Sequence, residues 1–128
     1  MTKSAVNHLF IYGTLRGGEE RAEILSKFSS KVYKDCKIRG KLINLQGGRY
    51  PGLISDDGSV VGEIHYTPKI QNILKILDNV ERFEGYGEDS SLFHRVLTYS
   101  NGIPCWTYVY AGSSDDGPVI ESGDWCKR

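Results

Sequence analysis

Residues 8–18 read HLFIYGTLRGG, and the architecture of this 128-residue chain can be worked out from them. The run from His8 to Tyr12 is apolar, rich in β-formers and stops at Gly13, as is typical of a buried strand that enters a loop. Glycines in such a loop let backbone N–H groups come close to an anionic or polarised oxygen. The sequence therefore predicts a strand whose carboxyl end carries a loop able to bind a ligand.

This loop has two further interpretations, a phosphate-binding loop and a simple turn. A phosphate-binding loop needs a Lys followed by Ser or Thr after the second glycine, whereas Glu19 and Glu20 follow Gly18 here. Their negative charge would repel a phosphate group. The other interpretation is a tight turn that only joins two elements.

Two helices are expected. Residues 19–28 place Ala22, Leu25 and Phe28 near one helical face. A second helix is predicted after Thr67 and Pro68, because threonine caps exposed amides and proline is tolerated in the first turn. Its apolar side consists of Ile70, Ile73, Leu74, Leu77 and Val80.

The remaining segments favour strands. One or two strands are expected over residues 32–45, one over 60–66, and a hairpin over 95–99 and 106–110 around Asn101, Gly102 and Pro104. Residues 50–53 and 56–58 are predicted to be bends. Together these elements predict a single domain over residues 1–128 of the α+β class, a small mixed β-barrel with two main helices.

The composition narrows the possible partners and compartments. Sixteen Lys and Arg balance sixteen Asp and Glu, so no basic excess favours nucleic acid or a membrane surface as a partner. The first seven residues are too polar for a signal peptide or a membrane span. The three cysteines are an odd number without CxxC spacing, which favours neither a disulfide framework nor a zinc site. We expect a cytoplasmic protein.

The histidines and cysteines give no sign of a metal or a nucleophile. His8, His65 and His94 have no metal-ligand spacing, and each lies in a strand-like context where a partly buried, hydrogen-bonded histidine is the commoner outcome. No cysteine has flanking residues that indicate an activated thiol. We therefore predict no metal site.

The second helix ends in a pair of glutamates that are candidates for acid and base chemistry. Glu81 lies four residues after Leu77, and Glu84 four residues after Val80, so both continue the apolar stripe. Burial raises the pKa of a carboxyl group toward the range useful for general acid and base catalysis. The alternative is a helix that frays before Gly85 and leaves both side chains in solvent.

The order of several short motifs resembles a known family. They are Tyr12-Gly13-Thr14-Leu15-Arg16, Tyr50-Pro51-Gly52, Val61-Gly62-Glu63, Leu77-Asp78-Asn79-Val80-Glu81, Arg95, Tyr108-Val109-Tyr110 and Ile120-Glu121-Ser122-Gly123-Asp124-Trp125. Each motif is weak alone. In this order they resemble the γ-glutamylcyclotransferase-like superfamily, most of all its AIG2-like and YtfP-like branch.

The resemblance implies a fold, a site and a reaction. It implies a mixed β-barrel with one pocket, in which Tyr12, Gly13, Thr14 and Leu15 (hereafter the 12–15 loop) bind the substrate through backbone amides. Glu81 closes the family's LDxxE pattern and is implied as the catalytic residue. Some relatives read LDxxEGY, and here the Glu-Gly-Tyr part falls at residues 84–86, which keeps Glu84 as the alternative base.

The implied reaction converts a small γ-glutamyl amine or amino acid to 5-oxoproline and a free amine, without a cofactor. A non-catalytic binding or regulatory domain on the same fold is the main alternative. A weaker one is an interaction module that uses Trp106 and Trp125. The sequence leaves open which amine is released and which oligomeric state the protein adopts.

Overall fold

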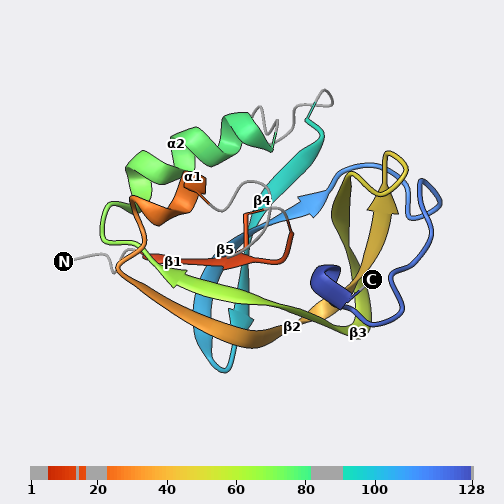
Figure 1. The fold of residues 1–128 in the computed structure, drawn as a ribbon, viewed down its shortest axis with the longest axis horizontal. Helices are drawn as coiled ribbons and strands as arrows, with labels where there is room; N and C mark the ends of the chain where they lie inside the picture. Colours follow the sequence, from red (N-terminus) through yellow and green to blue (C-terminus); the bar gives the residue numbers. More distant parts are fainter. Residues whose placement is uncertain (1–5, 14, 17–22, 82–90, 128) are drawn as a thin grey trace.

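The fold is a five-stranded mixed sheet with two helices on one face (Figure 1). The structure is a computed structural model that describes residues 6–13, 15–16, 23–81 and 91–127. In chain order the elements are β1 (His8–Ile11), α1 (Glu23–Ser26), β2 (Lys31–Leu45), β3 (Tyr50–Tyr66), α2 (Ile70–Val80), β4 (Phe93–Ser100), β5 (Ile103–Tyr110) and the 3-10 helix η1 (Trp125–Lys127).

The short strand β1 lies at the centre of the sheet, whose strand order is β2-β3-β1-β5-β4. It pairs antiparallel with β3, so that Ile11 lies opposite Glu63, and parallel with β5, where Leu9 lies opposite Trp106. The longer strands β2 and β3 form one hairpin, and β4 and β5 form another. The carboxyl end of β1 therefore delivers the 12–15 loop to the middle of the molecule.

The predicted α+β class with two helices is confirmed, but the sheet does not close into a barrel. Strands β2 and β4 are its two edges, and no backbone pairing joins them in the described part of the chain. The edges approach closely enough for the Ser100 hydroxyl to donate a hydrogen bond to the Lys37 carbonyl oxygen at 2.6 Å. The edge strands β2 and β4 are therefore joined by a side-chain contact, whereas a closed barrel would join them by a ladder of backbone hydrogen bonds.

Strand β3 begins earlier than the sequence predicts. Residues 50–53, predicted to be a bend, pair with β2, so that Tyr50 lies opposite Leu45 and Leu53 opposite Leu42. Residues 55–58 bulge out instead of ending the strand, because the ladder passes from Ile54 to Ser59. The bend predicted at residues 50–53 is wrong because pairing with β2 overrides their turn propensity. The bend predicted at residues 56–58 corresponds to the bulge, but it lies within one continuous strand and not between two elements.

The helices cover one face of the sheet, away from η1 (Figure 1). As predicted, α2 buries Ile70, Ile73, Leu74 and Leu77, which pack in one cluster with Leu25 of α1. Helix α1 ends at Ser26, before the predicted end at Phe28, and residues 19–22 of the predicted helix lie outside the described residues. Among the described helices, none is long and apolar enough to cross a membrane.

A second apolar cluster forms between the other side of the sheet and the carboxyl-terminal segment. Phe10 and Val60 from the central strands pack there with Trp125, whose side chain is fully buried. The backbone N–H of Val61 also donates to the Gly123 carbonyl oxygen at 2.8 Å. The last residues of the chain are thereby fixed to β3.

Candidate active site

A cavity of about 180 Å³ opens beside the end of β1. Its described lining residues come from segments far apart in the sequence, namely Phe10, Ile11, Tyr12, Gly13, Leu15, Tyr50, Pro51, Val80, Glu81, Leu92, Phe93, Thr107 and Tyr108. Apolar and aromatic walls with few polar groups are typical of small-molecule sites. The cavity joins the loop after β1 to the end of α2.

Glu81 is the only carboxylate among the described residues that line the cavity. It caps α2, and its backbone N–H donates to the Leu77 carbonyl oxygen at 2.8 Å. Since it follows Leu77 by four residues, its half-buried side chain stays on the inner side of the helix. The helix itself ends at Val80, before Glu81, and Glu84 lies outside the described residues.

The described part of the 12–15 loop lies against the same cavity. Tyr12, Gly13 and Leu15 line it, whereas Thr14 lies outside the described residues. The Arg16 backbone N–H donates to the Gly13 carbonyl oxygen at 3.0 Å and closes a turn. A Cβ atom at position 13 would lie 2.8 Å from Cγ of Pro51, so only glycine allows this approach without a shift. The structure thus brings Tyr12, Gly13 and Leu15 together with Glu81 at one cavity.

Two tyrosines beside Glu81 have raised pKa values. The Tyr12 hydroxyl donates to the Tyr108 carbonyl oxygen at 2.6 Å. Burial raises the pKa of Tyr12 well above its ordinary value, and the charge of Glu81 raises it further. Burial also raises the pKa of Tyr108, together with its hydrogen bond to Asp78. Both phenols stay protonated at neutral pH, so neither is available as a base there.

An Asp78-centred cluster links α2 to β4 and β5. Asp78 accepts hydrogen bonds from the Tyr108 hydroxyl and from Nη1 of Arg95, each at 2.6 Å. The Arg95 guanidinium lies 5.1 Å from the centre of the Trp106 ring, within cation–π range. These contacts fix the last turn of α2, which carries Glu81, against the cavity wall.

Comparison with known proteins places the chain in a family. Residues 9–127 match the family described as "Gamma-glutamyl cyclotransferase, AIG2-like". The chain belongs to this family. Its members are named as enzymes, so the predicted family and the predicted enzyme class are both confirmed.

Individual members of the γ-glutamyl cyclotransferase family align over most of the chain. The "Gamma-L-glutamyl-butirosin B gamma-glutamyl cyclotransferase" of Niallia circulans is 34% identical over 92% of this chain and 74% of its own length. The "Gamma-glutamylcyclotransferase family protein YtfP" of Escherichia coli is 32% identical over 94% and 96% of the two chains. The solution structure of E. coli YtfP matches with a TM-score of 0.61 at 28% identity, over 92% of this chain and 95% of that one.

Several residues at this family site belong to the motifs of the resemblance but were given no role by sequence analysis. Tyr50 and Tyr108 line the cavity. Asp78 contacts Tyr108 and Arg95. The sequence signals for these residues were the alternation of side chains along a strand for the tyrosines and the Leu77-Asp78 pair before Glu81. Neither signal shows which side chains contact one another.

The hydrogen bond between Tyr108 and Asp78 is expected to stabilise the fold. Tyr108→Phe removes a buried donor to a charged acceptor and should lower the free energy of unfolding by about 1.5–3 kcal/mol, measured by urea denaturation. Tyr110→Phe is the matched control, because the Tyr110 hydroxyl donates to Asp116 at the same 2.6 Å in an exposed position. It should cost at most about 1 kcal/mol. Equal losses in the two variants would contradict this difference.

The histidines lie apart from the cavity lining. His65 is buried, and Nε2 lies 3.0 Å from Oε1 of Glu63 while Nδ1 lies 2.8 Å from the Ser29 hydroxyl. Among the described residues, no three His, Cys, Asp or Glu side chains gather in a way that could hold a metal ion. The three cysteines, Cys36, Cys105 and Cys126, are free thiols.

Proposed function

We propose that this protein converts a γ-glutamyl amine or γ-glutamyl amino acid to 5-oxoproline and the free amine. The observation that carries the proposal is the shared cavity of Glu81 and the described residues of the 12–15 loop, in a chain of the γ-glutamyl cyclotransferase family. The proposal takes residues 1–128 as one such domain. It also places the protein in the cytoplasm, a reducing compartment that suits three free thiols.

Glu81 acts as the general base and then as the general acid. A free α-amine is mostly protonated at neutral pH, and it attacks as the neutral amine after losing one proton to solvent. Glu81 takes a second proton from this nitrogen as the nitrogen forms a bond to the side-chain carbonyl carbon. The tetrahedral intermediate then breaks its bond to the leaving nitrogen, which receives the proton from Glu81. The conversion of the γ-glutamyl amide to 5-oxoproline and the free amine therefore consumes no water and no co-reactant.

Orientation supplies much of the rate in this scheme. Both reacting groups belong to one molecule, and holding such groups in a reactive geometry contributes about 7–11 kcal/mol. The aromatic and aliphatic walls of the cavity favour a folded γ-glutamyl group. The backbone N–H groups of Gly13, Thr14 and Leu15 are the proposed donors to the developing oxyanion.

The cavity suits the γ-glutamyl group rather than the whole substrate. At about 180 Å³ it is smaller than the roughly 300 Å³ at which pockets for drug-sized ligands begin. The released amine would therefore extend toward the mouth. The relative from Niallia circulans is named for γ-L-glutamyl-butirosin B, which supports the proposal of a γ-glutamyl amide of a larger amine as substrate.

A panel of substrates tests the proposed function. The chain is incubated with γ-glutamyl-lysine, γ-glutamyl dipeptides, a γ-glutamyl aminoglycoside and glutathione, and 5-oxoproline is measured by chromatography. We expect release from at least one of them. Binding of 5-oxoproline without turnover of any member would instead support the non-catalytic binding domain.

Turnover is expected to continue in a metal chelator. The steps proposed for Glu81 and the 12–15 loop need only a carboxylate and backbone amides, so dialysis against EDTA should leave the rate of 5-oxoproline release unchanged. The rate before and after dialysis is compared directly. A loss restored by added zinc would contradict the mechanism.

A further inference from the structure

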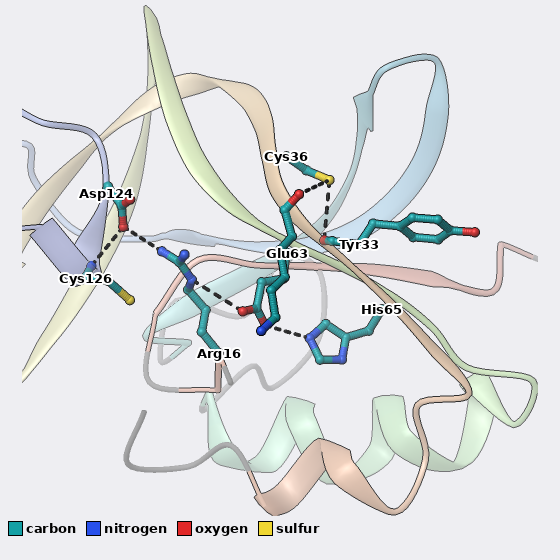
Figure 2. Close-up of polar contacts among 8 residues, drawn as sticks. Arg16, Tyr33, Cys36, Glu63, His65, Asp124 and Cys126 are labelled. Atoms are coloured by element: carbon teal, nitrogen blue, oxygen red, sulfur yellow. Dashed lines mark hydrogen bonds and ion pairs between the residues drawn. The ribbon is translucent and has the colours of Figure 1, made fainter. Parts of the chain in front are cut away.

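A row of polar and charged side chains lies beside the 12–15 loop and has no part in the proposed chemistry. It consists of the buried residues Arg16, Glu63, His65 and Asp124 and the partly buried Ser29, and we call it the Arg16 cluster. Figure 2 shows Arg16 between Glu63 and Asp124, with His65 on the other side of Glu63. Nη1 of Arg16 lies 2.7 Å from Oδ1 of Asp124, and Nε lies 3.9 Å from Oε2 of Glu63.

The cluster holds a charge that is costly to bury. The Arg16 side chain is only 8% exposed, and those of Glu63 and Asp124 are 5% and 7% exposed. Burial by itself lowers the pKa of the Arg16 guanidinium, but the hydrogen bond to Asp124 and the nearby negative charges, those of Asp124 and Glu63 among them, together outweigh this and the pKa is raised. A buried cation is stable only with well-placed anions, so the two carboxylates determine where the Arg16 side chain can lie.

The position of Arg16 in turn determines the shape of the loop. Its backbone N–H closes the turn to the Gly13 carbonyl oxygen, and Leu15 beside it is buried in the core. The side chain of Arg16 anchors one end of this turn, while Tyr12 at the other end is held by its hydrogen bond to the Tyr108 carbonyl oxygen. Between these two anchors, the described residues Gly13 and Leu15 line the cavity that Glu81 also lines.

Both carboxylates are themselves held firmly. Glu63 lies on β3 directly opposite Ile11 of β1, the strand that leads into the loop. Asp124 also accepts a hydrogen bond from the Cys126 backbone N–H at 2.9 Å, and the preceding residue, Gly123, is bonded to Val61 of β3. The carboxyl-terminal segment therefore brings a rigidly placed charge to a loop 108 residues away.

The cluster also holds the chain beyond the loop. Glu63 and His65 are two residues apart on β3, so their side chains lie on the same face of the sheet. Glu63 contacts Arg16, and His65 contacts Ser29, just after α1. Neighbouring side chains of one strand thus fix the segment at Arg16 and again at Ser29.

We propose that Arg16 is a positioning residue, which sets the amides of the 12–15 loop for catalysis, and that Asp124 of the carboxyl-terminal segment is required to hold it there. This inference rests on the proposed function, because the loop amides are the proposed oxyanion donors. Neither residue touches the substrate. Their effect reaches the reaction through Gly13 and Leu15.

The test compares a buried Arg–Asp ion pair with an exposed one. Asp124→Asn removes the charge but keeps an acceptor, and Asp57→Asn is its control, because Asp57 pairs with Arg39 while the two side chains are 94% and 80% exposed. Small displacements of catalytic groups cost up to about 10²-fold. We expect Asp124→Asn to lower kcat/KM per folded molecule by about 10- to 100-fold, and Asp57→Asn to leave it unchanged.

Two substitutions of Arg16 separate its charge from its shape. Arg16→Gln should lose about as much kcat/KM as Asp124→Asn. Arg16→Lys keeps a cation between the carboxylates and should restore part of the loss, an outcome that a general loss of stability does not predict. If Arg16→Gln fails to fold, Asp124→Asn and Arg16→Lys, which change the site less, carry the test.

Amide hydrogen exchange gives a readout that does not depend on activity. We expect the amides of Leu15 and Arg16 to exchange faster in Asp124→Asn, while amides in the β4–β5 hairpin keep the rates of the unaltered chain. Unchanged exchange in the loop, or kcat/KM within about twofold of the control, would overturn the inference. If the unaltered chain releases no 5-oxoproline, the proposed function fails, and hydrogen exchange still decides whether Arg16 positions the loop.

Discussion

Glu81→Gln is expected to lower kcat for 5-oxoproline formation by about 10²–10⁴-fold, the usual loss when a general acid or base is removed. Glutamine keeps the size and hydrogen-bonding reach of the side chain but cannot take a proton from the α-amine. The raised pKa values of Tyr12 and Tyr108 keep both phenols protonated, so neither replaces the base at neutral pH. Initial rates and thermal unfolding are measured together, since the half-buried Glu81 at the end of α2 should not be needed for folding.

Glu84→Gln is the matched control for this prediction. The two glutamates are three residues apart, and the alternative EGY register would assign the base to Glu84. Because Glu81 lines the cavity, we expect Glu84→Gln to reduce the rate much less. Loss of 5-oxoproline formation in Glu84→Gln with a near-normal rate in Glu81→Gln would show that Glu84 is the base. If neither substitution matters and no γ-glutamyl compound reacts, the binding-domain alternative replaces the enzyme.

The helical face of the fold was predictable because its signals are local. Helix α2 repeats apolar residues at helical spacing after Thr67 and Pro68, and the predicted residues Ile70, Leu74 and Leu77 are buried in the structure. Such a pattern specifies which side of a helix packs, whatever it packs against. The helix end was less predictable, since α2 stops at Val80 while the sequence pattern continues.

The strand β3 was misinterpreted because its stability comes from pairing with a distant partner. Pro51 and Gly52 have turn propensity, yet they lie opposite Asn44 and Ile43 of β2. Gly52 also lets the aromatic ring of Tyr110 approach, because a Cβ at position 52 would lie 3.1 Å from the Tyr110 Cβ. The ladder and this close packing override the local preference, and neither can be seen in a window of a few residues.

The candidate site was predictable as a set of motifs but not as an arrangement. The resemblance pointed to the 12–15 loop and Glu81, whereas nothing local links Arg16 to Asp124 or Asp78 to Tyr108. These pairs are 108 and 30 residues apart in the chain. Long-range pairs between charged or polar side chains depend on the strand order, which single residues do not reveal. The motifs contain the residues that support the site, but the sequence does not show which of them pair.

Gly13→Ala is expected to lower kcat/KM by about 10²-fold, because it tests how closely the 12–15 loop must approach the strand beside it. The new methyl group would lie 2.8 Å from Cγ and 3.0 Å from Cδ of Pro51. Pro51 is a rigid ring held in the β2–β3 ladder, so the loop has to move, and its amides move with it. Overpacking of this kind also costs about 1–3 kcal/mol of stability, measured by urea denaturation.

Gly102→Ala separates the loss of stability from the displacement of the loop. Gly102 lies in the β4–β5 turn with φ of +77°, and no atom lies within 4 Å of the added methyl group. Alanine there is strained, so we expect a loss of roughly 1–2 kcal/mol with unchanged kcat/KM per folded molecule. Steady-state kinetics at matched folded concentration distinguish the two glycines. Activity of Gly13→Ala within about threefold of Gly102→Ala would mean that the loop amides do not have to hold their position, and the proposed oxyanion site would lose its basis.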